Sequence, residues 1–157
     1  MPSPSELHVT FVCTGNICRS PMADKIFADA IAREGLSDRV RVTSAGTGSW
    51  HVGDGADPRT VAELEANGYP SEHRARTLDD DILAADLVVA LDTGHRRDLL
   101  RAGVPEERLA LLRSFDPDAD SESVDDPYYG DAQDFETVRV QVEAAVPGLL
   151  AWVADRV

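Results

Sequence analysis

The chain has 157 residues, 43% hydrophobic and 28% charged, which predicts one globular domain spanning residues 1–157. Its net charge of −14 disfavours nucleic acid and anionic membranes as partners, because both repel an acidic surface. No apolar run is long enough to span a membrane, and the N-terminal stretch MPSPSELHV lacks the basic and apolar regions of a secretory signal, so we expect a cytoplasmic protein; export without a signal peptide stays open.

Stretches rich in apolar and β-branched residues, which are typical of strands, alternate along the chain with stretches whose apolar residues have helical spacing. In chain order we expect a strand at 7–13, a helix at 20–35, a strand at 39–46, helices at 57–69 and 78–85, a strand at 86–92, a helix at 93–103, a strand at 108–115 and a helix at 135–157. The last helix carries its apolar residues near one face, namely Val138, Val142, Ala145, Leu149 and Trp152. Strands separated by helices predict the α/β class: a four-stranded parallel sheet with helices on both faces.

One long irregular stretch, DPDADSESVDDPYYGDAQD at residues 116–134, interrupts this alternation. It is acidic and contains proline and glycine, and for residues 116–125 we favour a solvated surface loop. Long loops in compact domains also tend to carry function, so DDPYYG is a separate candidate.

The loop after the first strand, in VCTGNICRSP, carries the strongest chemical signal. Ligands of open α/β sheets bind beyond the carboxyl ends of the strands, and a loop entering a helix N-terminus presents N–H groups to an anion. Cys13 opens this loop and Arg19, whose planar guanidinium can hold two phosphate oxygens, closes it. Gly15 and Asn16 tolerate the backbone conformations that a tight loop needs. These residues predict a phosphate-binding loop with a thiolate nucleophile.

Other interpretations compete with this one. A cysteine at a strand end is often a small buried apolar residue. Zinc binding by the two cysteines would need some of the four histidines, and the spacing fits no common zinc site; these histidines are His8, His51, His73 and His95. Ser20 is either a helix cap or a hydroxyl that donates to the Cys13 thiolate.

The motif VCTGNICRSPMA resembles the active-site loop of the low-molecular-weight protein tyrosine phosphatases, and the motifs TSAGTGSWHVG, HRAR and DPYYG resemble later motifs of that family in the same order. The resemblance covers nearly the whole chain. It implies a four-stranded parallel sheet flanked by helices, and hydrolysis of phosphotyrosine through a cysteinyl-phosphate intermediate without a metal or other cofactor.

The resemblance also assigns roles. Cys13 resembles the nucleophile, Arg19 the phosphate-binding arginine, Ser20 the hydroxyl that stabilises the thiolate, and Asp126 the general acid, in preference to Asp125 or Asp131. By the same resemblance, the backbone from Thr14 to Arg19 completes the phosphate site; it includes Gly15, Asn16, Ile17 and Cys18. Asn16 and His73 resemble members of a network that holds the loop in shape, although His73 alone would be read as an exposed polar residue.

Three aromatic residues, Trp50, Tyr128 and Tyr129, resemble the walls of the substrate slot. The two tyrosines are also open to interpretation as phosphorylation sites. Cys18 resembles the loop cysteine that forms a disulfide with the nucleophile after oxidation, and a residue that only packs under the loop is the alternative.

Two rival functions were weighed. A thiol-dependent arsenate reductase would need a cysteine beyond Cys13 and Cys18, and the chain has no other. A non-catalytic phosphotyrosine-binding module is disfavoured by the intact Cys13, Arg19 and Asp126. We therefore expect phosphotyrosine-containing proteins as partners, inorganic phosphate as product, and a monomer.

Overall fold

The structure is a computed structural model, and it describes residues 6–157. Residues 1–5 lie outside the described residues. They belong to the expected domain 1–157 and to the N-terminal stretch in which no secretory signal is expected. Within residues 6–157, no helix combines the length and the apolar character that crossing a bilayer requires.

Four strands form one sheet in the order β2-β1-β3-β4, and all neighbouring pairs are parallel. The strands are β1 (Leu7–Cys13), β2 (Val40–Gly46), β3 (Leu87–Ala90) and β4 (Leu109–Leu111). The predicted α/β class and the four-stranded parallel sheet are confirmed. Central strands β1 and β3 are almost wholly buried, which explains their near-continuous apolar sequence.

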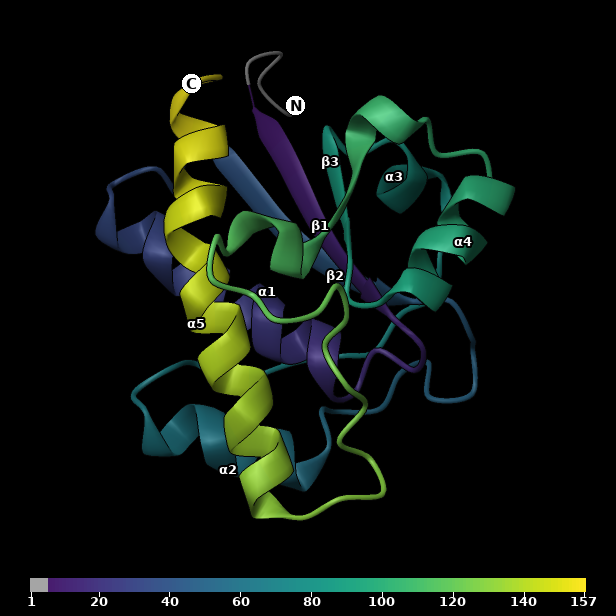
Figure 1. Ribbon diagram of the computed structural model, residues 1–157, viewed down its shortest axis with the longest axis vertical. Coiled ribbons are helices and arrows are strands. Elements are labelled where there is room, and N and C mark those ends of the chain that lie inside the picture. The colour runs from purple at the N-terminus through teal and green to yellow at the C-terminus, as the bar shows by residue number, and fades with distance from the viewer. Residues whose placement is uncertain (1–5) are drawn as a thin grey trace.

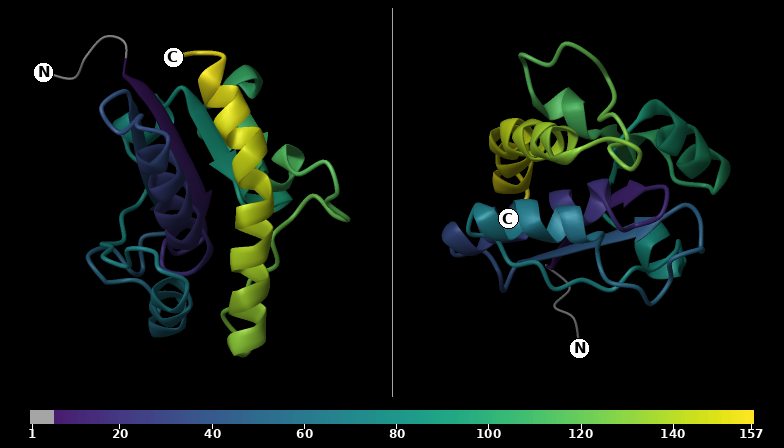
Figure 2. Two further views of the ribbon diagram at one scale, coloured as in Figure 1. Left: turned by 90° about the vertical axis from the view of Figure 1, so that its left-hand side faces the viewer. Right: turned by 90° about the horizontal axis from the view of Figure 1, so that it is seen from below.

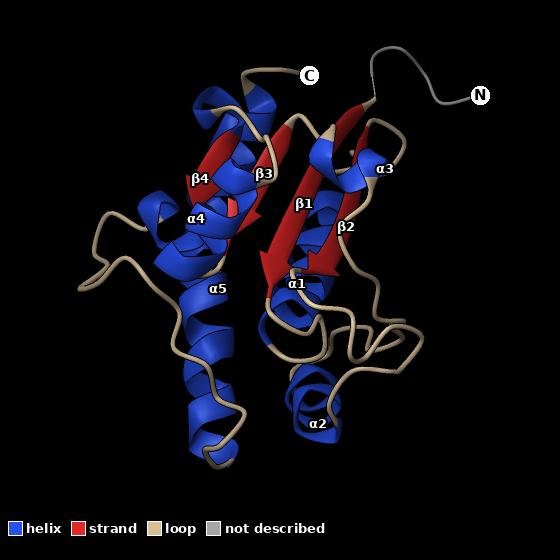
Figure 3. Ribbon diagram, turned by 90° about the vertical axis from the view of Figure 1, so that its right-hand side faces the viewer, coloured by secondary structure: helices blue, strands red, loops and turns tan. Residues whose placement is uncertain are grey.

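Helices cover both faces of the sheet, as expected (Figures 1 and 3). The helices are α1 (Arg19–Arg33), α2 (Pro58–Ala66), α3 (Asp80–Leu83), α4 (Thr93–Arg101) and α5 (Ala132–Ala154). Helices α1 and α5 pack on one face in a core that includes Val9 and Phe11. Helices α3 and α4 pack on the other face around Val12 and Val88. Successive residues of a strand point to opposite faces, which produces these two cores.

Two predicted boundaries were wrong, one for a tertiary reason and one because of a local helix cap. The strand expected at 108–115 ends at Leu111, and Leu112–Phe115 form a 3₁₀ turn. This turn packs against α5, where a Cβ on Gly148 would collide with the carbonyl oxygen of Phe115. Helix α5 begins before residue 135 because Asp131 caps it, accepting from two backbone N–H groups of the first turn.

The segment 116–131 is irregular, as expected, but Val124 within it is not solvated. Val124 is fully buried, and its N–H donates to the carbonyl of Leu91, just after β3. The bulk of the segment is exposed, so residues 116–123 fit the expectation and Val124 corrects it. The anchor fixes where the following residues, including Asp126, leave the sheet.

The strand order places a ligand site between β1 and β3. The chain leaves β1 toward β2 on one side and later reaches β3 on the other, so the connections after β1 and β3 diverge at the carboxyl end of the sheet. Such a switch point opens a crevice in parallel α/β sheets. Helix α2 and the N-terminal half of α5 extend beyond the same end (Figures 2 and 3). Cys13 ends β1 at this edge of the sheet, and Leu91 directly follows β3.

Candidate active site

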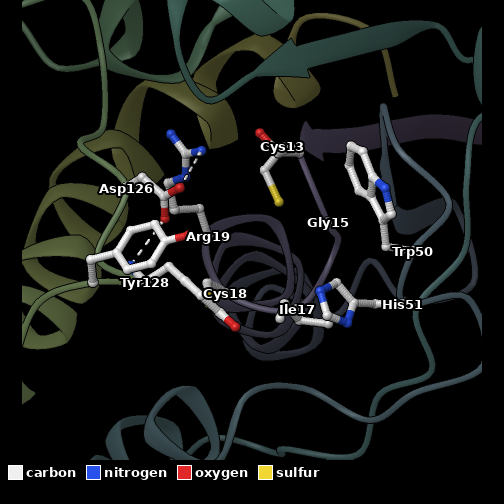
Figure 4. Close-up of a pocket in the computed structure, with 11 residues that line it drawn as sticks. Cys13, Gly15, Ile17, Cys18, Arg19, Trp50, His51, Asp126 and Tyr128 are labelled. Atoms are coloured by element: carbon white, nitrogen blue, oxygen red, sulfur yellow. Dashed lines mark hydrogen bonds and ion pairs between the residues drawn. The ribbon is translucent and has the colours of Figure 1, made fainter.

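A pocket of about 270 Å³ lies at this crevice (Figure 4). The residues that line it are Cys13, Thr14, Gly15, Ile17, Cys18, Arg19, Trp50, His51, Asp126, Tyr128 and Tyr129. Ten of these eleven were predicted from sequence; His51 was not. The predicted residues Asn16, Ser20 and His73 lie behind the pocket wall instead.

Residues 13–19, which we call the cysteine loop, connect β1 to α1. Within residues 6–157, the backbone N–H groups of residues 14–18 donate no hydrogen bond to another protein group. Buried N–H groups are nearly always paired, so a row of free ones beside a pocket indicates a place for oxygen acceptors. Helix α1 starts here without a side-chain cap and without an acidic residue in its first turn. Its N-terminal partial charge therefore favours an anion in the pocket.

The thiol of Cys13 is held by one directed hydrogen bond. Cys13 Sγ lies 2.9 Å from Ser20 Oγ, and Ser20 Oγ accepts from Asn16 Nδ2 at 2.8 Å. Because the Asn16 amide is the donor in its bond, the Ser20 proton is free to point at the sulfur. Ser20 is thus placed to stabilise a thiolate on Cys13 and is not the cap of α1, whose N-cap residue, Cys18, makes no side-chain bond.

Asn16 organises the loop from behind. It is fully buried and adopts a φ of 56°, the left-handed region that asparagine tolerates better than most residues. Its Nδ2 also donates to Ser44 Oγ at 3.0 Å, and its Oδ1 accepts from the Arg76 N–H at 2.9 Å. Ser44 in turn donates to the buried Asp24 carboxylate at 2.9 Å. The Arg76 N–H can only donate and the Asp24 carboxylate accepts. These two groups therefore fix which of the groups between them donate and which accept.

His73 completes this support. Its Nε2 donates to the Asn16 carbonyl at 2.7 Å, which requires the proton on Nε2 because a carbonyl can only accept. Burial lowers the pKa of His73, and the bond to Asn16 opposes this only in part, so the ring is neutral at neutral pH. His73 therefore lies in the network behind the loop and is not an exposed polar residue.

Arg19 is almost completely buried, and half of its guanidinium is occupied by protein acceptors. Nη1 donates to Asp92 Oδ2 and to the Val124 carbonyl, both at 2.8 Å. Nη2 lies 3.7 Å from Asp126 Oδ2, across the pocket. The Nε–Nη2 edge is therefore left to face a ligand, and it can take two oxygens of a tetrahedral oxyanion. Sequence reasoning missed Asp92 and Val124, although Asp92 is the last residue of a predicted strand.

Asp92 also bonds α4. Its Oδ1 accepts from the His95 N–H at 2.8 Å and caps the helix. Burial opposes ionisation of Asp92, but the His95 N–H, the nearby His95 and Arg19 outweigh it and lower its pKa. His95 Nε2 meets Thr14 Oγ1 at 2.8 Å. Its Nδ1 lies 3.1 Å from Asp92 Oδ1 but off the direction of a hydrogen bond. Burial lowers the pKa of His95 to about 4, so this ring is neutral at pH 7.

Cys18 lies at the floor of the pocket as a buried thiol, and both cysteines are free. Burial raises its pKa to about 12, with smaller contributions from the negative charges of Asp57, Cys13 and Asp126. Unlike Cys13, it has no hydroxyl arranged to stabilise a thiolate. Cys18 is therefore protonated at any physiological pH.

Aromatic side chains border the mouth of the pocket. Trp50 and Tyr128 lie on opposite sides, with Cys13 Sγ between them and deeper (Figure 4). Trp50 is 75% exposed and its ring lies over Gly48, where a Cβ would collide with it. Tyr129 packs edge to face on Tyr128 at 4.9 Å and is 94% exposed. The rings of Trp50 and Tyr128, on opposite sides of the buried Cys13 thiol, form a slot for a flat ring.

Asp126 reaches over the pocket from the segment that follows Val124. Its Oδ1 accepts from the Tyr128 N–H at 3.1 Å, and the carboxyl group is half exposed. Asp125 is exposed and does not line the pocket, and Asp131 is engaged as the cap of α5. Of the three candidate carboxylates, Asp126 is the one at the pocket.

The histidines do not gather around the cysteines. His8 bonds Thr43 at 2.7 Å, far down the sheet, while His51, His73 and His95 contact three separate parts of the cysteine loop. No group of three or more histidine, cysteine or acidic side chains among residues 6–157 is arranged to hold a metal ion.

The site thus belongs to a recognisable class: α/β phosphatases in which a cysteine at the end of the first strand opens an oxyanion-binding loop. Residues 8–157 match the family model described as low molecular weight phosphotyrosine protein phosphatase. The chain is a member of that family.

Relatives named as phosphatases cover nearly the whole chain. The chain is 57% identical to low molecular weight protein-tyrosine phosphatase A of Mycobacterium tuberculosis, over 96% of this chain and 93% of the relative. It is 49% identical to a low molecular weight protein-tyrosine-phosphatase of Streptomyces coelicolor, over 95% and 94%. The crystal structure of a protein tyrosine phosphatase from Entamoeba histolytica superposes with a TM-score of 0.90 at 29% identity, covering 96% of this chain and 98% of that one.

Proposed function

We propose that this protein hydrolyses phosphotyrosine in proteins, and aryl phosphates in general, through a cysteinyl-phosphate intermediate. The observation that supports this most directly is the convergence of Cys13 Sγ, the free edge of Arg19 and the Asp126 carboxyl on one pocket between Trp50 and Tyr128. A nucleophile, an oxyanion clamp and an acid at one point are what phosphoryl transfer from a phenol requires.

In the first step, Cys13 Sγ attacks phosphorus while the bond from phosphorus to the phenolic oxygen breaks. The N–H groups of residues 14–18 and the Nε–Nη2 edge of Arg19 stabilise the charge on the three remaining oxygens. Protonated Asp126 gives its proton to the leaving oxygen, so that a neutral phenol departs.

In the second step, the ionised Asp126 takes a proton from water, and the oxygen of that water attacks phosphorus. The bond from phosphorus to sulfur breaks and releases inorganic phosphate. Ser20, whose hydroxyl lies 2.9 Å from Cys13 Sγ, donates to the departing thiolate and stabilises it. The proton taken from water restores the acid for the next cycle.

The depth of the slot supports an aryl substrate. Cys13 is buried at the bottom while the rings of Trp50 and Tyr128 stand at the mouth. A phosphorylated tyrosine extends far enough to reach the sulfur and offers a ring that packs between these walls, whereas a phosphoserine is shorter and has no ring.

The closest rivals differ in what they need. An arsenate reductase would need a further cysteine to carry electrons away, and both cysteines of this chain lie in the cysteine loop. Among similar solved structures, two are described as arginine phosphatases, from Drosophila and from Bacillus subtilis, with TM-scores of 0.85 and 0.83 at 28–29% identity. Phosphoarginine therefore belongs in the test.

The assignment is tested by phosphate release from one peptide sequence carrying phosphotyrosine, phosphoserine or phosphoarginine. Wild type should act on the phosphotyrosine peptide far faster than on the other two. Cys13→Ser should lose turnover yet still bind inorganic phosphate, because the N–H groups and Arg19 remain while a hydroxyl is a much weaker nucleophile. Turnover by Cys13→Ser, or a preference for phosphoarginine, would overturn the proposal.

The identity of the acid is tested with two leaving groups. Asp126→Ala should lose about a hundred- to ten-thousand-fold in kcat/KM, which reports the first step, on phenyl phosphate, whose phenol is basic, and much less on 4-nitrophenyl phosphate. The basic limb of its pH profile should flatten. Asp125→Ala, the neighbouring control, should change little on either substrate. An equal loss from Asp126→Ala on both substrates would show that another group is the acid.

For the setting, we propose a monomeric, single-domain enzyme (residues 1–157) in the cytoplasm that reverses tyrosine phosphorylation in signalling. A nucleophilic cysteine must stay reduced, which a cytoplasmic compartment ensures. Sedimentation at the concentrations used for kinetics tests the monomer, and fractionation of cells with an antibody tests the compartment.

A further inference from the structure

Arg59, in the first turn of α2, does not line the pocket, yet it contacts the residues that carry Asp126. Its Nη2 donates to the Tyr128 carbonyl at 3.0 Å, and its Nη1 faces the Gly130 carbonyl at 3.3 Å. Nε and Nη2 also bond the two oxygens of Asp57, each at 3.0 Å. One guanidinium thus joins α2 to residues 126–130, which we call the Asp126 segment.

The flat faces of Arg59 are occupied as well. The guanidinium carbon lies 4.5 Å from the ring centre of Phe135 and 5.7 Å from that of Tyr128. Phe135 is buried in the first turns of α5, so it provides a fixed base, whereas Tyr128 is 40% exposed at the pocket mouth. Stacking of arginine on aromatic rings is attractive, and here it restrains the wall residue that follows the proposed acid.

The other end of this connection is the cysteine loop. The Asp57 N–H donates to the Ile17 carbonyl at 2.9 Å, and Thr60 Oγ1 donates to the Cys18 carbonyl at 3.4 Å. Asp57 also caps α2 through the Arg59 N–H. The side-chain bond from Arg59 is the largest of the effects that lower the pKa of Asp57, so this carboxylate stays ionised.

The Asp126 segment has few other attachments. Its remaining hydrogen bonds are internal, from the Tyr128 N–H to Asp126 and from the Gly130 N–H to the Pro127 carbonyl. Within residues 6–157, the hydrogen bonds that tie the backbone of this segment to another element come from Arg59. The ion pair between Asp126 and Arg19, at 3.7 Å, is long.

We propose that Arg59 is a positioning residue that holds the Asp126 segment over Cys13 by gripping two of its carbonyl oxygens, with Asp57 linking this grip to the cysteine loop. The proposal rests on the proposed function, because it requires Asp126 to act as the acid. Arg59 touches neither the substrate nor the reacting atoms, and it acts through the placement of Asp126. A displacement of about 1 Å is enough to cost a large part of such a contribution.

The first test compares Arg59→Gln with wild type on phenyl phosphate and 4-nitrophenyl phosphate. Misplacing an acid matters when the leaving group needs a proton, so kcat/KM, which reports the first step, should fall about tenfold or more on phenyl phosphate and only a few-fold on 4-nitrophenyl phosphate. Inhibition by inorganic phosphate should be unchanged, because the cysteine loop remains. Equal losses on both substrates would overturn the proposal.

The second test is a double-mutant cycle with Asp126→Ala. A residue that works through Asp126 has nothing left to position once that carboxyl is gone, so Arg59→Gln should cause no further loss on phenyl phosphate in the Asp126→Ala background. A full, additive loss would overturn the proposal. If Asp126→Ala itself shows no dependence on the leaving group, the assignment of the acid has failed, a result distinct from failure of Arg59 alone.

Matched variants separate positioning from stability. Arg139→Gln removes another arginine that joins α5 to α2, through Glu63 at 2.6 Å; it also bonds Glu143 of its own helix at 2.6 Å, and it is remote from the pocket. It should lower the unfolding midpoint without a leaving-group effect. Asp57→Asn keeps a capping residue and loses the ion pair, so it should reproduce the Arg59→Gln signature more weakly. A leaving-group effect in Arg139→Gln equal to that of Arg59→Gln would overturn the proposal.

Discussion

Substitution of Asn16 tests the support of the cysteine loop most sharply. Its amide makes three hydrogen bonds in a fully buried position, to Ser20, Ser44 and the Arg76 N–H, and its backbone has a φ of 56°. Alanine at this position removes the amide and keeps the unfavourable backbone conformation, whereas glycine removes the amide and relieves the backbone.

The expected cost of Asn16→Ala follows from these contacts. Leaving the Arg76 N–H without its acceptor costs about 1–3 kcal/mol, and each bond lost to the two serines costs about 1 kcal/mol. A left-handed alanine costs about 1 kcal/mol more than glycine. The free energy of unfolding should therefore fall by roughly 4–6 kcal/mol in Asn16→Ala and by about 1 kcal/mol less in Asn16→Gly.

The assay is urea unfolding of the three proteins, with kcat measured on 4-nitrophenyl phosphate. Both variants should be slower than wild type, since the Ser20 proton is no longer directed at Cys13. Asn67→Ala, which removes an exposed asparagine bonded to Glu63, is the control and should stay within about 0.5 kcal/mol of wild type. Equal stability of Asn16→Ala and Asn16→Gly would refute the backbone argument, and a loss below about 1 kcal/mol in both would refute the hydrogen-bond argument.

Three further outcomes are expected. Arg19→Lys should lose nearly all turnover of 4-nitrophenyl phosphate, because an ammonium cannot replace a two-pronged edge; activity within about tenfold of wild type would contradict this. After peroxide treatment, a thiol reductant should restore wild type but not Cys18→Ser. The fraction of wild type that recovers should rise with the pH of the peroxide step, because the Cys18 thiol, with its pKa raised to about 12 by burial, must lose its proton to form a disulfide with oxidised Cys13. Equal recovery of the two proteins would make Cys18 a packing residue. Hydrogen bonds from Arg41 lower the pKa of Asp81 to about 2, so the stability that they add is present above about pH 4 and is lost as pH falls toward 2. The difference in melting temperature between wild type and Asp81→Asn should therefore close over that range. A constant difference would refute the coupling.

The parts of the molecule that the sequence predicts well are those set by local pattern. Strand β1, the turn into α1 and the end of α1 near Gly35 depend on neighbouring residues, and their bounds agree with the structure within two positions. The cysteine loop was found for the same reason, because Cys13 and Arg19 are six residues apart and a strand and a helix flank them.

The residues that sequence reasoning missed act across long separations. Asp92 lies 73 positions from Arg19 and Val124 lies 105 positions from it, yet both bond the same guanidinium nitrogen. A single chain has no local sign of which distant acceptor a buried arginine will find. Arg59 was passed over because an arginine in a polar helix resembles any solvated one. The end of β4 was misjudged because the contact of Phe115 with α5 outweighs the strand pattern.

A strongly negative chain should repel a doubly negative substrate, but this repulsion weakens with the distance of each charge from the pocket. Charges farther away than about 8 Å are largely screened at physiological ionic strength, so most of the net charge of −14 acts weakly at the pocket. Within the pocket, Arg19 already has Asp92 as its partner, so its charge alone is not the main attraction. The free N–H groups of residues 14–18 and the start of α1 act at contact distance in a partly dry site, where dipoles are strongest. We therefore expect phosphate binding to depend on the shape of the cysteine loop more than on net charge. The buried hydrogen bonds of Asn16 hold this shape.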